Sequence, residues 1–293
     1  MKKLLKPILI ILIAALVIGS LGFGAYKFFK SRGSTVPGTT SEEAKKESAE
    51  KAKKDRERKQ AVLLDTIKEL FNLESPGTTY SLAIYDLNNE EYFGVNDKTP
   101  QHAASVSKIL TATYVLSQVE KGKATLAEPL GAYNVGFQLE KTVNQSDPET
   151  WALLDDRFKP ADQNKFATAS GLQNTNVSIG KNLMSTEDVA TLLRKLYKHE
   201  ILGEVYVNKL FTYMQNTESE NFFSPVFKLN SLVFYHKTGK LEGEAHDAAI
   251  VEHKANPFIL VVFTVNNSNL DPNTRSGIMQ KVAQTVLDYF DSI

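Results

Sequence analysis

The feature that most constrains the fold is the distribution of strand-like segments over residues 61–293. Two short segments, Tyr80–Asp86 and Glu91–Val95, are separated by Leu-Asn-Asn-Glu and predict a β-hairpin. Three more segments are spaced for an antiparallel meander near the C-terminus: Leu232–His236, Asp247–Glu252 and Phe258–Val265. We therefore expect strands from both ends of this region to share one sheet.

Helical patterns lie around and between these strands. Apolar residues recur at helical spacing in four segments, 61–72, 105–121, 185–199 and 276–290. Gly122 should end the second of these helices, and Ser185 or Thr186 should cap the third. The predicted fold class is α+β: an antiparallel sheet flanked by terminal helices, with a long helical insert as a second lobe. A site is expected in the cleft between sheet and insert.

The N-terminus carries an apolar run from Pro7 to about Phe29, preceded by three lysines. The run is long enough to cross about 30 Å of hydrocarbon as a helix. It offers only a poor cleavage site, so residues 1–32 are predicted to be an uncleaved membrane anchor. The flanking positive charges nearly balance, but a short N-terminal tail favours a single-pass protein whose bulk lies outside the cytoplasm.

Residues 33–60 are predicted to be a polar linker before a domain at residues 61–293. The linker is a hinge followed by a mixed-charge segment, which is either a solvated helix or a disordered spacer. Residues 1–60 hold 14 of the 34 basic and 6 of the 34 acidic side chains, which leaves 20 basic and 28 acidic for residues 61–293. This acidic domain is not expected to bind nucleic acid. The chain has no cysteine, hence no disulfide and no thiolate metal site.

The segment AASVSKIL contains two serines near one lysine. Residues three apart lie on one face of a helix, so Lys108 should serve Ser105 and not Ser107. At a helix N-terminus, free N–H groups would stabilise an alkoxide or oxyanion on Ser105. A Lys108 amine kept neutral by burial and by a second cation could accept the serine proton. The spacing also occurs at Ser48 and Ser178, but only Ser105 begins an apolar helix that follows a hairpin.

Two further motifs agree with this interpretation. Lys237-Thr238-Gly239 ends a strand predicted to face the insert: the lysine supplies charge for a substrate carboxylate, the threonine hydroxyl can bind it, and glycine lets a ligand approach the backbone. Ser146 lies between the two motifs in sequence and is suited to pass protons between Lys108 and a leaving group.

With these three motifs in order, residues 62–293 resemble the class A β-lactamases and penicillin-binding serine enzymes, whose signatures are S-x-x-K, S-D-N and K-T/S-G. The resemblance implies that Ser105 is the acylated nucleophile, Lys108 its base and Ser146 the proton shuttle. It also implies that Lys237 and Thr238 hold the substrate carboxylate, and that the N–H groups of Ser105 and Lys240 form the oxyanion hole.

The chain departs from this pattern in two places. Pro148 stands where the family has the asparagine of S-D-N, and proline has neither a side-chain donor or acceptor nor an N–H. Asn144 is a poor replacement because it lies upstream. The family's deacylating glutamate is also missing, since Asp162 is the one carboxylate between Asp156 and Thr186.

Three functions remain open at this point. The first is a membrane-anchored serine hydrolase of the class A β-lactamase type, acylated at Ser105 by a β-lactam. The second is a D-Ala-D-Ala peptidase-like penicillin-binding protein with slow deacylation. The third is a catalytically impaired domain that binds cell-wall peptide or a protein partner. No cofactor is expected. His236, His246 and His253 lack zinc-site spacing, and His102 and Trp151 are interpreted as packing residues.

Overall fold

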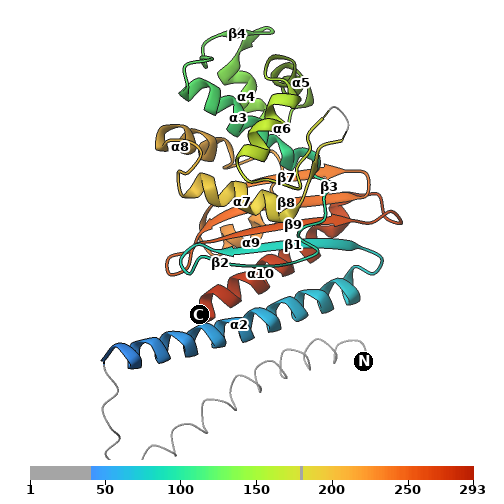
Figure 1. The fold of residues 1–293 in the computed structure, drawn as a ribbon. Coiled ribbons are helices and arrows are strands. Elements are labelled where there is room, and N and C mark those ends of the chain that lie inside the picture. The colour runs from blue at the N-terminus through green and yellow to red at the C-terminus, as the bar shows by residue number, and fades with distance from the viewer. Residues whose placement is uncertain (1–40, 179–180) are drawn as a thin grey trace, which may run out of the picture. The chain divides into compact units, whose positions relative to one another are not determined.

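A computed structural model describes residues 41–178 and 181–293 (Figure 1). The predicted anchor at residues 1–32 and the first part of the linker lie outside these ranges. Among the helices within residues 41–178 and 181–293, none combines the length and the apolar character needed to cross a membrane.

A five-stranded antiparallel sheet joins the two ends of the domain, as the strand pattern predicted. Its order is β2-β1-β9-β8-β7. The strands are β1 (Thr79–Asp86), β2 (Glu91–Val95), β7 (Val233–Leu241), β8 (Glu244–Glu252) and β9 (Phe258–Val265). The link between the ends is the β1–β9 pair, in which Asp86 lies opposite Phe258. The central strand β9 is almost entirely buried because both sheet faces are covered.

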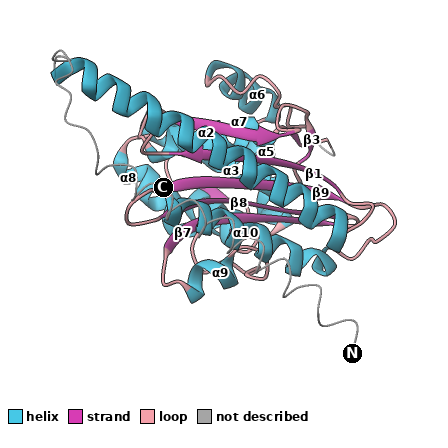
Figure 2. Cartoon of the chain, turned by 90° about the horizontal axis from the view of Figure 1, so that it is seen from below, coloured by secondary structure: helices cyan, strands magenta, loops and turns pink. Residues whose placement is uncertain are grey.

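Helices cover the two faces of the sheet (Figures 1 and 2). On one face lie α9 (Ser224–Leu229), α10 (Ser276–Ser292) and the C-terminal part of α2 (Ser41–Glu74). On the other face lies the helical insert, which includes α7 (Thr186–Tyr197). Strand alternation divides the core accordingly: Leu82 faces α2 and α10, and Ala83 faces the insert.

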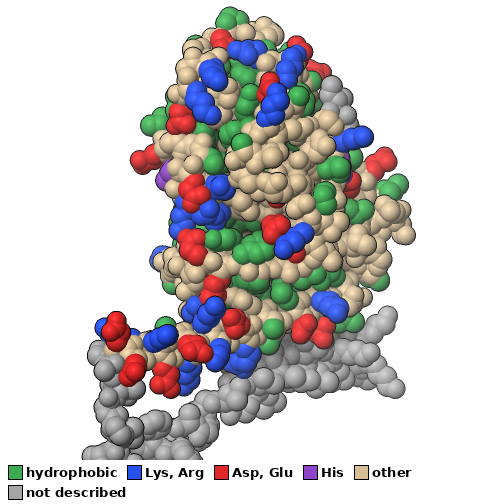
Figure 3. Space-filling view, in the orientation of Figure 1, with side chains coloured by type: hydrophobic (Ala, Val, Ile, Leu, Met, Phe, Trp, Pro, Cys, Tyr) green, Lys and Arg blue, Asp and Glu red, His purple; other side chains and the backbone are tan. Residues whose placement is uncertain are grey.

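Helix α2 begins in the predicted linker and continues without a break past residue 60. The mixed-charge segment is therefore helical from Ser41 onward, with acidic and basic side chains interspersed along it (Figure 3). The compact unit that carries the sheet spans Lys54–Ile293. Within this unit Leu63, Ile67 and Phe71 of α2 are buried.

The insert is helical throughout most of its length. Its elements are β3 (Gln101–His102), the 3₁₀ turn η1 (Ala104–Ser107), α3 (Lys108–Glu120), β4 (Pro129–Leu130), β5 (Tyr133–Asn134), α4 (Val135–Asn144), α5 (Pro148–Arg157), α6 (Pro160–Ala169), β6 (Leu183–Met184), α7 and α8 (Glu204–Tyr213). A second 3₁₀ turn, η2 (Pro272–Arg275), precedes α10. Ser185 caps α7 by accepting a bond from the Asp188 N–H at 3.1 Å, as predicted.

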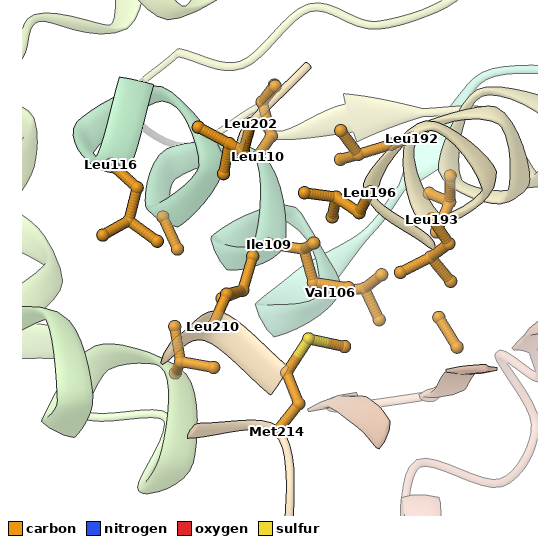
Figure 4. Packing of buried hydrophobic residues seen from close by; sticks show 14 of the residues in the cluster. Val106, Ile109, Leu110, Leu116, Leu192, Leu193, Leu196, Leu202, Leu210 and Met214 are labelled. Atoms are coloured by element: carbon orange, nitrogen blue, oxygen red, sulfur yellow. The ribbon is translucent and has the colours of Figure 1, made fainter. Parts of the chain in front are cut away.

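Helix α3 is the centre of the insert. The helix predicted from Ser105 begins as η1 and becomes an α-helix at Lys108, and Gly122 follows its end with φ +68°. Ile109 and Leu110 on α3 pack with Leu192 and Leu196 of α7 (Figure 4). This apolar contact fixes the turn that carries Ser105 between the insert and the sheet.

Candidate active site

Ser105 projects from a tight turn that packs against strand β7. The preceding Ala104 has φ +44°, in the left-handed region that costs a residue with a Cβ about 1 kcal/mol. Gly239 of β7 makes room for this turn, because a Cβ there would lie 2.9 Å from the Ala103 carbonyl oxygen. The close contact brings Ser105 beside the Lys237-Thr238-Gly239 strand.

Lys108 is bonded to Ser105, as the three-residue spacing predicted. Its Nζ donates to Ser105 Oγ at 3.1 Å and to the Ser146 carbonyl oxygen at 2.6 Å. The Ser107 hydroxyl donates instead to the Ala104 carbonyl at 2.8 Å. Ser105 is therefore the hydroxyl within reach of the Lys108 amine.

Ser146 lies between two lysines. Its backbone has φ +55°, and its hydroxyl accepts a short hydrogen bond from Lys237 Nζ, while its carbonyl accepts the bond from Lys108. Lys237 also donates to the Thr238 carbonyl at 3.1 Å. The structure thus brings Ser105, Lys108, Ser146 and Lys237 together from three separate stretches of sequence.

Both lysines are buried, and both have lowered pKa values. Burial lowers the pKa of Lys108 to about 8, opposed by the negative charges of Asp147 and Asp155. Burial, and then the positive charge of Lys108, lower the pKa of Lys237 to about 7. Lys237 is the second cation that the sequence analysis required near Lys108, and the two amines titrate as a coupled pair.

The motifs open into a cleft of about 390 Å³. Its lining residues are Ser105, Asn144, Ser146, Thr217, Glu218, Ser219, Lys237, Thr238 and Lys240. All of the predicted site residues line it except Gly239, which packs behind Ser105, and Lys108, which lies beneath it. The loop at residues 217–219 was not predicted to lie in the site, because nothing in its composition marks it and only the fold brings it to the cleft.

The Ser-Asp-Pro sequence has a structural explanation. Asp147 caps α5 by accepting a 2.8 Å bond from the Thr150 N–H, and Pro148 occupies the first helical position, where a missing N–H costs nothing. Asn144 does not replace the missing asparagine. Its amide donates to the Tyr213 and Gln215 carbonyls at 3.2 and 3.0 Å. These bonds tie the end of α4 to the end of α8 and the loop after it.

The carboxylates of the insert are not placed like a deacylating base. Asp162 is paired with Lys165 at 2.8 Å on the surface of α6 and does not line the cleft. Asp155 is partly buried, burial raises its pKa, and it accepts a 2.7 Å bond from Gln163. Among the residues that the structure describes, Glu218 is the one carboxylate in the cleft lining, and it lies near enough to Lys237 to act on its pKa.

His236 lies behind Lys237 and links three elements. Its Nδ1 is 3.1 Å from Asp247 on β8, and its Nε2 is 3.1 Å from Glu220 on the loop after the cleft wall. Burial alone would lower the pKa of His236, but Asp247 and Glu220 raise it to about 9. The imidazolium therefore holds the loop that carries Glu220 against the sheet. This role of His236 could not be predicted from the sequence, since neither carboxylate is near it along the chain.

His102, which precedes the turn that carries Ser105, is also paired. His102 Nδ1 lies 2.7 Å from Glu244 Oε2, so this residue is an ion-pair partner of β8 as well as a packing residue. Within the described residues, no three histidine or carboxylate side chains are placed to hold a metal ion.

The fold is that of the β-lactamases and penicillin-binding proteins, and the cleft brings the three sequence motifs together. The sequence matches the model of the Beta-lactamase enzyme family over residues 63–134 and 131–290, and the chain belongs to that family. Comparison with curated protein sequences gave no match.

Solved structures agree with this assignment at the level of the fold. The chain is similar to PBP-A, with 22% identity, a TM-score of 0.71, and coverage of 78% of this chain and 97% of PBP-A. A leucine-to-glutamate mutant of PBP-A, described as an acyl-enzyme complex with penicillin G, gives 23% identity, a TM-score of 0.72, and coverage of 80% and 97%. A β-lactamase from Chitinophaga pinensis gives 19% identity, a TM-score of 0.70, and coverage of 77% of this chain and 98% of that β-lactamase.

Proposed function

We propose that this protein is an active-site-serine hydrolase of the class A β-lactamase type, acylated at Ser105 by the amide of a β-lactam. The observation that carries the proposal is the 3.1 Å bond between Lys108 Nζ and Ser105 Oγ at the base of an open cleft. A neutral Lys108 accepts the Ser105 proton as Oγ attacks the lactam carbonyl carbon. The C–N bond then breaks, and the ring nitrogen receives a proton through the Ser146 hydroxyl.

The substrate end of the cleft fits an anion. Lys237 and Thr238 line the cleft and would bind the substrate carboxylate through an ammonium and a hydroxyl. The N–H groups of Ser105 and Lys240 would stabilise the tetrahedral oxyanion. These roles rest on the family resemblance together with the positions of the residues around the cleft.

A second candidate, a D-Ala-D-Ala peptidase-like penicillin-binding protein, is favoured by one observation. Asp162, the one carboxylate between Asp156 and Thr186, is paired with Lys165 on the surface and does not line the cleft, so it is not placed to activate water at Ser105. An acyl group on Ser105 would then be released slowly. Penicillin G as the acylating ligand of a PBP-A mutant supports a β-lactam as the first probe.

We also propose that residues 1–32 anchor the protein in the cell membrane as a single span, with the catalytic domain outside the cytoplasm. The apolar run Pro7–Phe29 and the short tail before it support this location. Protease added outside intact cells should digest the domain. Protection of the domain until the cells are lysed would contradict the proposed orientation.

Intact-protein mass spectrometry during incubation with a penicillin tests the acylation. Wild type and the matched control Ser107→Ala should both gain the mass of one penicillin, and Ser105→Ala should not. Loss of the adduct within seconds, with hydrolysed penicillin appearing, would indicate a β-lactamase. Persistence for hours would indicate the peptidase-like protein. Absence of an adduct with several β-lactams would refute acylation and leave the impaired binding domain.

A further inference from the structure

Trp151 contacts the proposed base directly. Lys108 Nζ lies 4.7 Å from the centroid of the indole ring, over its face. A lysine ammonium has three N–H bonds, and two of them go to Ser105 Oγ and the Ser146 carbonyl. The aromatic ring is the third neighbour, and the negative face of an indole attracts a cation more strongly than other aromatic rings do.

We propose that Trp151 is a positioning residue for Lys108, which holds the lysine amine against Ser105 by a cation–π contact. This inference rests on the proposed function, since it assigns a role in the acylation of Ser105. Pro148 has no side-chain acceptor to offer Lys108, and Trp151 lies one helical turn further along α5. The same helix that begins with the proline therefore supplies the contact.

A chain of hydrogen bonds fixes the indole ring. Its Nε1 donates to Thr111 Oγ1 at 3.1 Å, and the Thr111 hydroxyl donates to Gln163 Oε1 at 2.7 Å. The Gln163 amide then donates to Asp155 Oδ1 at 2.7 Å. The chain joins α3, α5 and α6, and Thr111 and Gln163 are buried. Because each member has a partner, the network holds the ring in one orientation.

The ring acts on Lys108 together with the charges that face it. Lys237 on β7 repels the Lys108 ammonium, and Asp147 and Asp155 at the two ends of α5 attract it. The indole face adds attraction for the charged form without removing a proton from Lys108. Trp151 therefore sets where the amine lies and also the pH at which it becomes a base.

Lysine NMR on the full-length protein tests this without a substrate. The ¹³Cε signal of Lys108, assigned with Lys108→Arg, is titrated in wild type, Trp151→Phe and Trp151→Leu. Leucine keeps an apolar group at the site but removes the ring, so the Lys108 pKa should fall by about one unit. Phenylalanine should give a smaller shift. An unchanged or higher pKa in Trp151→Leu would overturn the proposal.

The hydrogen-bond chain has its own test. Thr111→Val removes the acceptor of the indole N–H and should shift the Lys108 pKa in the same direction, by less than Trp151→Leu does. Thr113→Val is the matched control, because Thr113 is also buried on α3 but bonds only the Ile109 carbonyl of its own helix. Equal shifts in the two valine variants would contradict a specific role for the chain.

The kinetic readout separates this inference from the proposed function. In Trp151→Leu the pH of half-maximal acylation by a chromogenic cephalosporin should fall with the Lys108 pKa. In Trp151→Phe this pH should lie close to the wild-type value. A wild type that is not acylated would refute the proposed function, while the NMR titration would still decide the contact. Acylation in wild type with an unshifted profile in Trp151→Leu would refute the positioning role alone.

Discussion

Two buried lysines meet at Ser146, and this pair determines what the site can do. Lys108 binds the Ser146 carbonyl, and Lys237 binds its hydroxyl. Two ammonium groups this close repel each other, so the pair releases a proton more readily than exposed lysines do. Because the pKa of Lys237 is the lower of the two, the state with a neutral Lys108 and a charged Lys237 is favoured when a bound anion stabilises the Lys237 ammonium.

Acylation should depend on pH through this pair. The rate constant should rise about tenfold per pH unit below 7 and level off above about 8, because only neutral Lys108 accepts the Ser105 proton. The dissociation constant for the substrate should rise as Lys237 loses its charge above about pH 7. Stopped-flow kinetics at several substrate concentrations separates the two effects. A rate constant that is flat from pH 5 to 9 would contradict the role of Lys108.

Gly239 is predicted to be essential for the position of the nucleophile. In Gly239→Ala the new methyl group would lie 2.9 Å from the Ala103 carbonyl and 3.1 Å from the Ala104 Cβ, so the turn before Ser105 must move. Such overpacking costs about 1–3 kcal/mol, and acylation should slow by at least tenfold. Thermal unfolding and acylation rates measure both effects. Gly277→Ala, where the methyl group meets open space in helix α10, should lower neither the unfolding temperature nor the acylation rate.

At the scale of elements, the cleft wall depends on contacts between β7, β8 and the loop at residues 217–223. His236 joins them through Asp247 and Glu220, and the Phe223 N–H bonds Asp247 Oδ2 at 3.1 Å. Lys240, on the same strand face, donates to Asn221 at 2.6 Å. The strand that carries the third motif is therefore tied to the loop opposite it.

The charged His236 should make stability depend on pH in a defined window. Its folded-state pKa of about 9 exceeds the ordinary 6.5, so its contribution is complete below pH 6.5 and is lost as pH rises through 9. The contribution is about 3 kcal/mol. In His236→Gln this part of the pH dependence should disappear, and stability at pH 6 should fall because the buried Asp247 loses its cation and the half-buried Glu220 keeps only Lys228.

Urea denaturation at pH 6, 8 and 10 measures this dependence. The control His199→Asn changes an exposed histidine with φ +54°, a conformation that asparagine tolerates, and should keep the wild-type profile. Parallel pH profiles for wild type and His236→Gln would show that His236 is not the group that titrates.

At the scale of the molecule, strands from distant parts of the chain pair in one sheet, and α2 covers one face of it. Leu63, Ile67 and Phe71 of α2 are buried against β1 and α10, and Arg56 forms a 2.7 Å ion pair with Glu91 on β2. The first helix is thus part of the domain from Lys54 onward.

Truncation tests this boundary. Residues 54–293 should unfold at the same temperature as the full chain, whereas residues 75–293 lose three buried apolar side chains, each worth about 2–4 kcal/mol. The shorter piece should unfold without a cooperative transition, as measured by calorimetry and circular dichroism. Equal melting temperatures for the two pieces would contradict a structural role for α2.

Much of the fold could be predicted because its signals are local. The hairpin, the meander and the C-terminal helix follow from alternation and helical spacing within short segments, and the Ser185 cap from residue type. The start of α3 was predicted three residues early, because the strain at Ala104 and the 3₁₀ turn depend on packing against Gly239. The linker at residues 33–60 had two interpretations, since a charged segment without an apolar stripe gives no periodic signal.

The sequence by itself determined the order of the elements, the three motifs and the pairing of Lys108 with Ser105, because each depends on residues within a few positions of one another. Only the tertiary structure decided what surrounds them. The stacking of Lys108 on Trp151, the burial of His236 between two carboxylates and the loop at residues 217–219 join segments that are far apart in the chain. Such contacts form when the sheet and the insert exclude water, and no local pattern encodes which side chains will meet there.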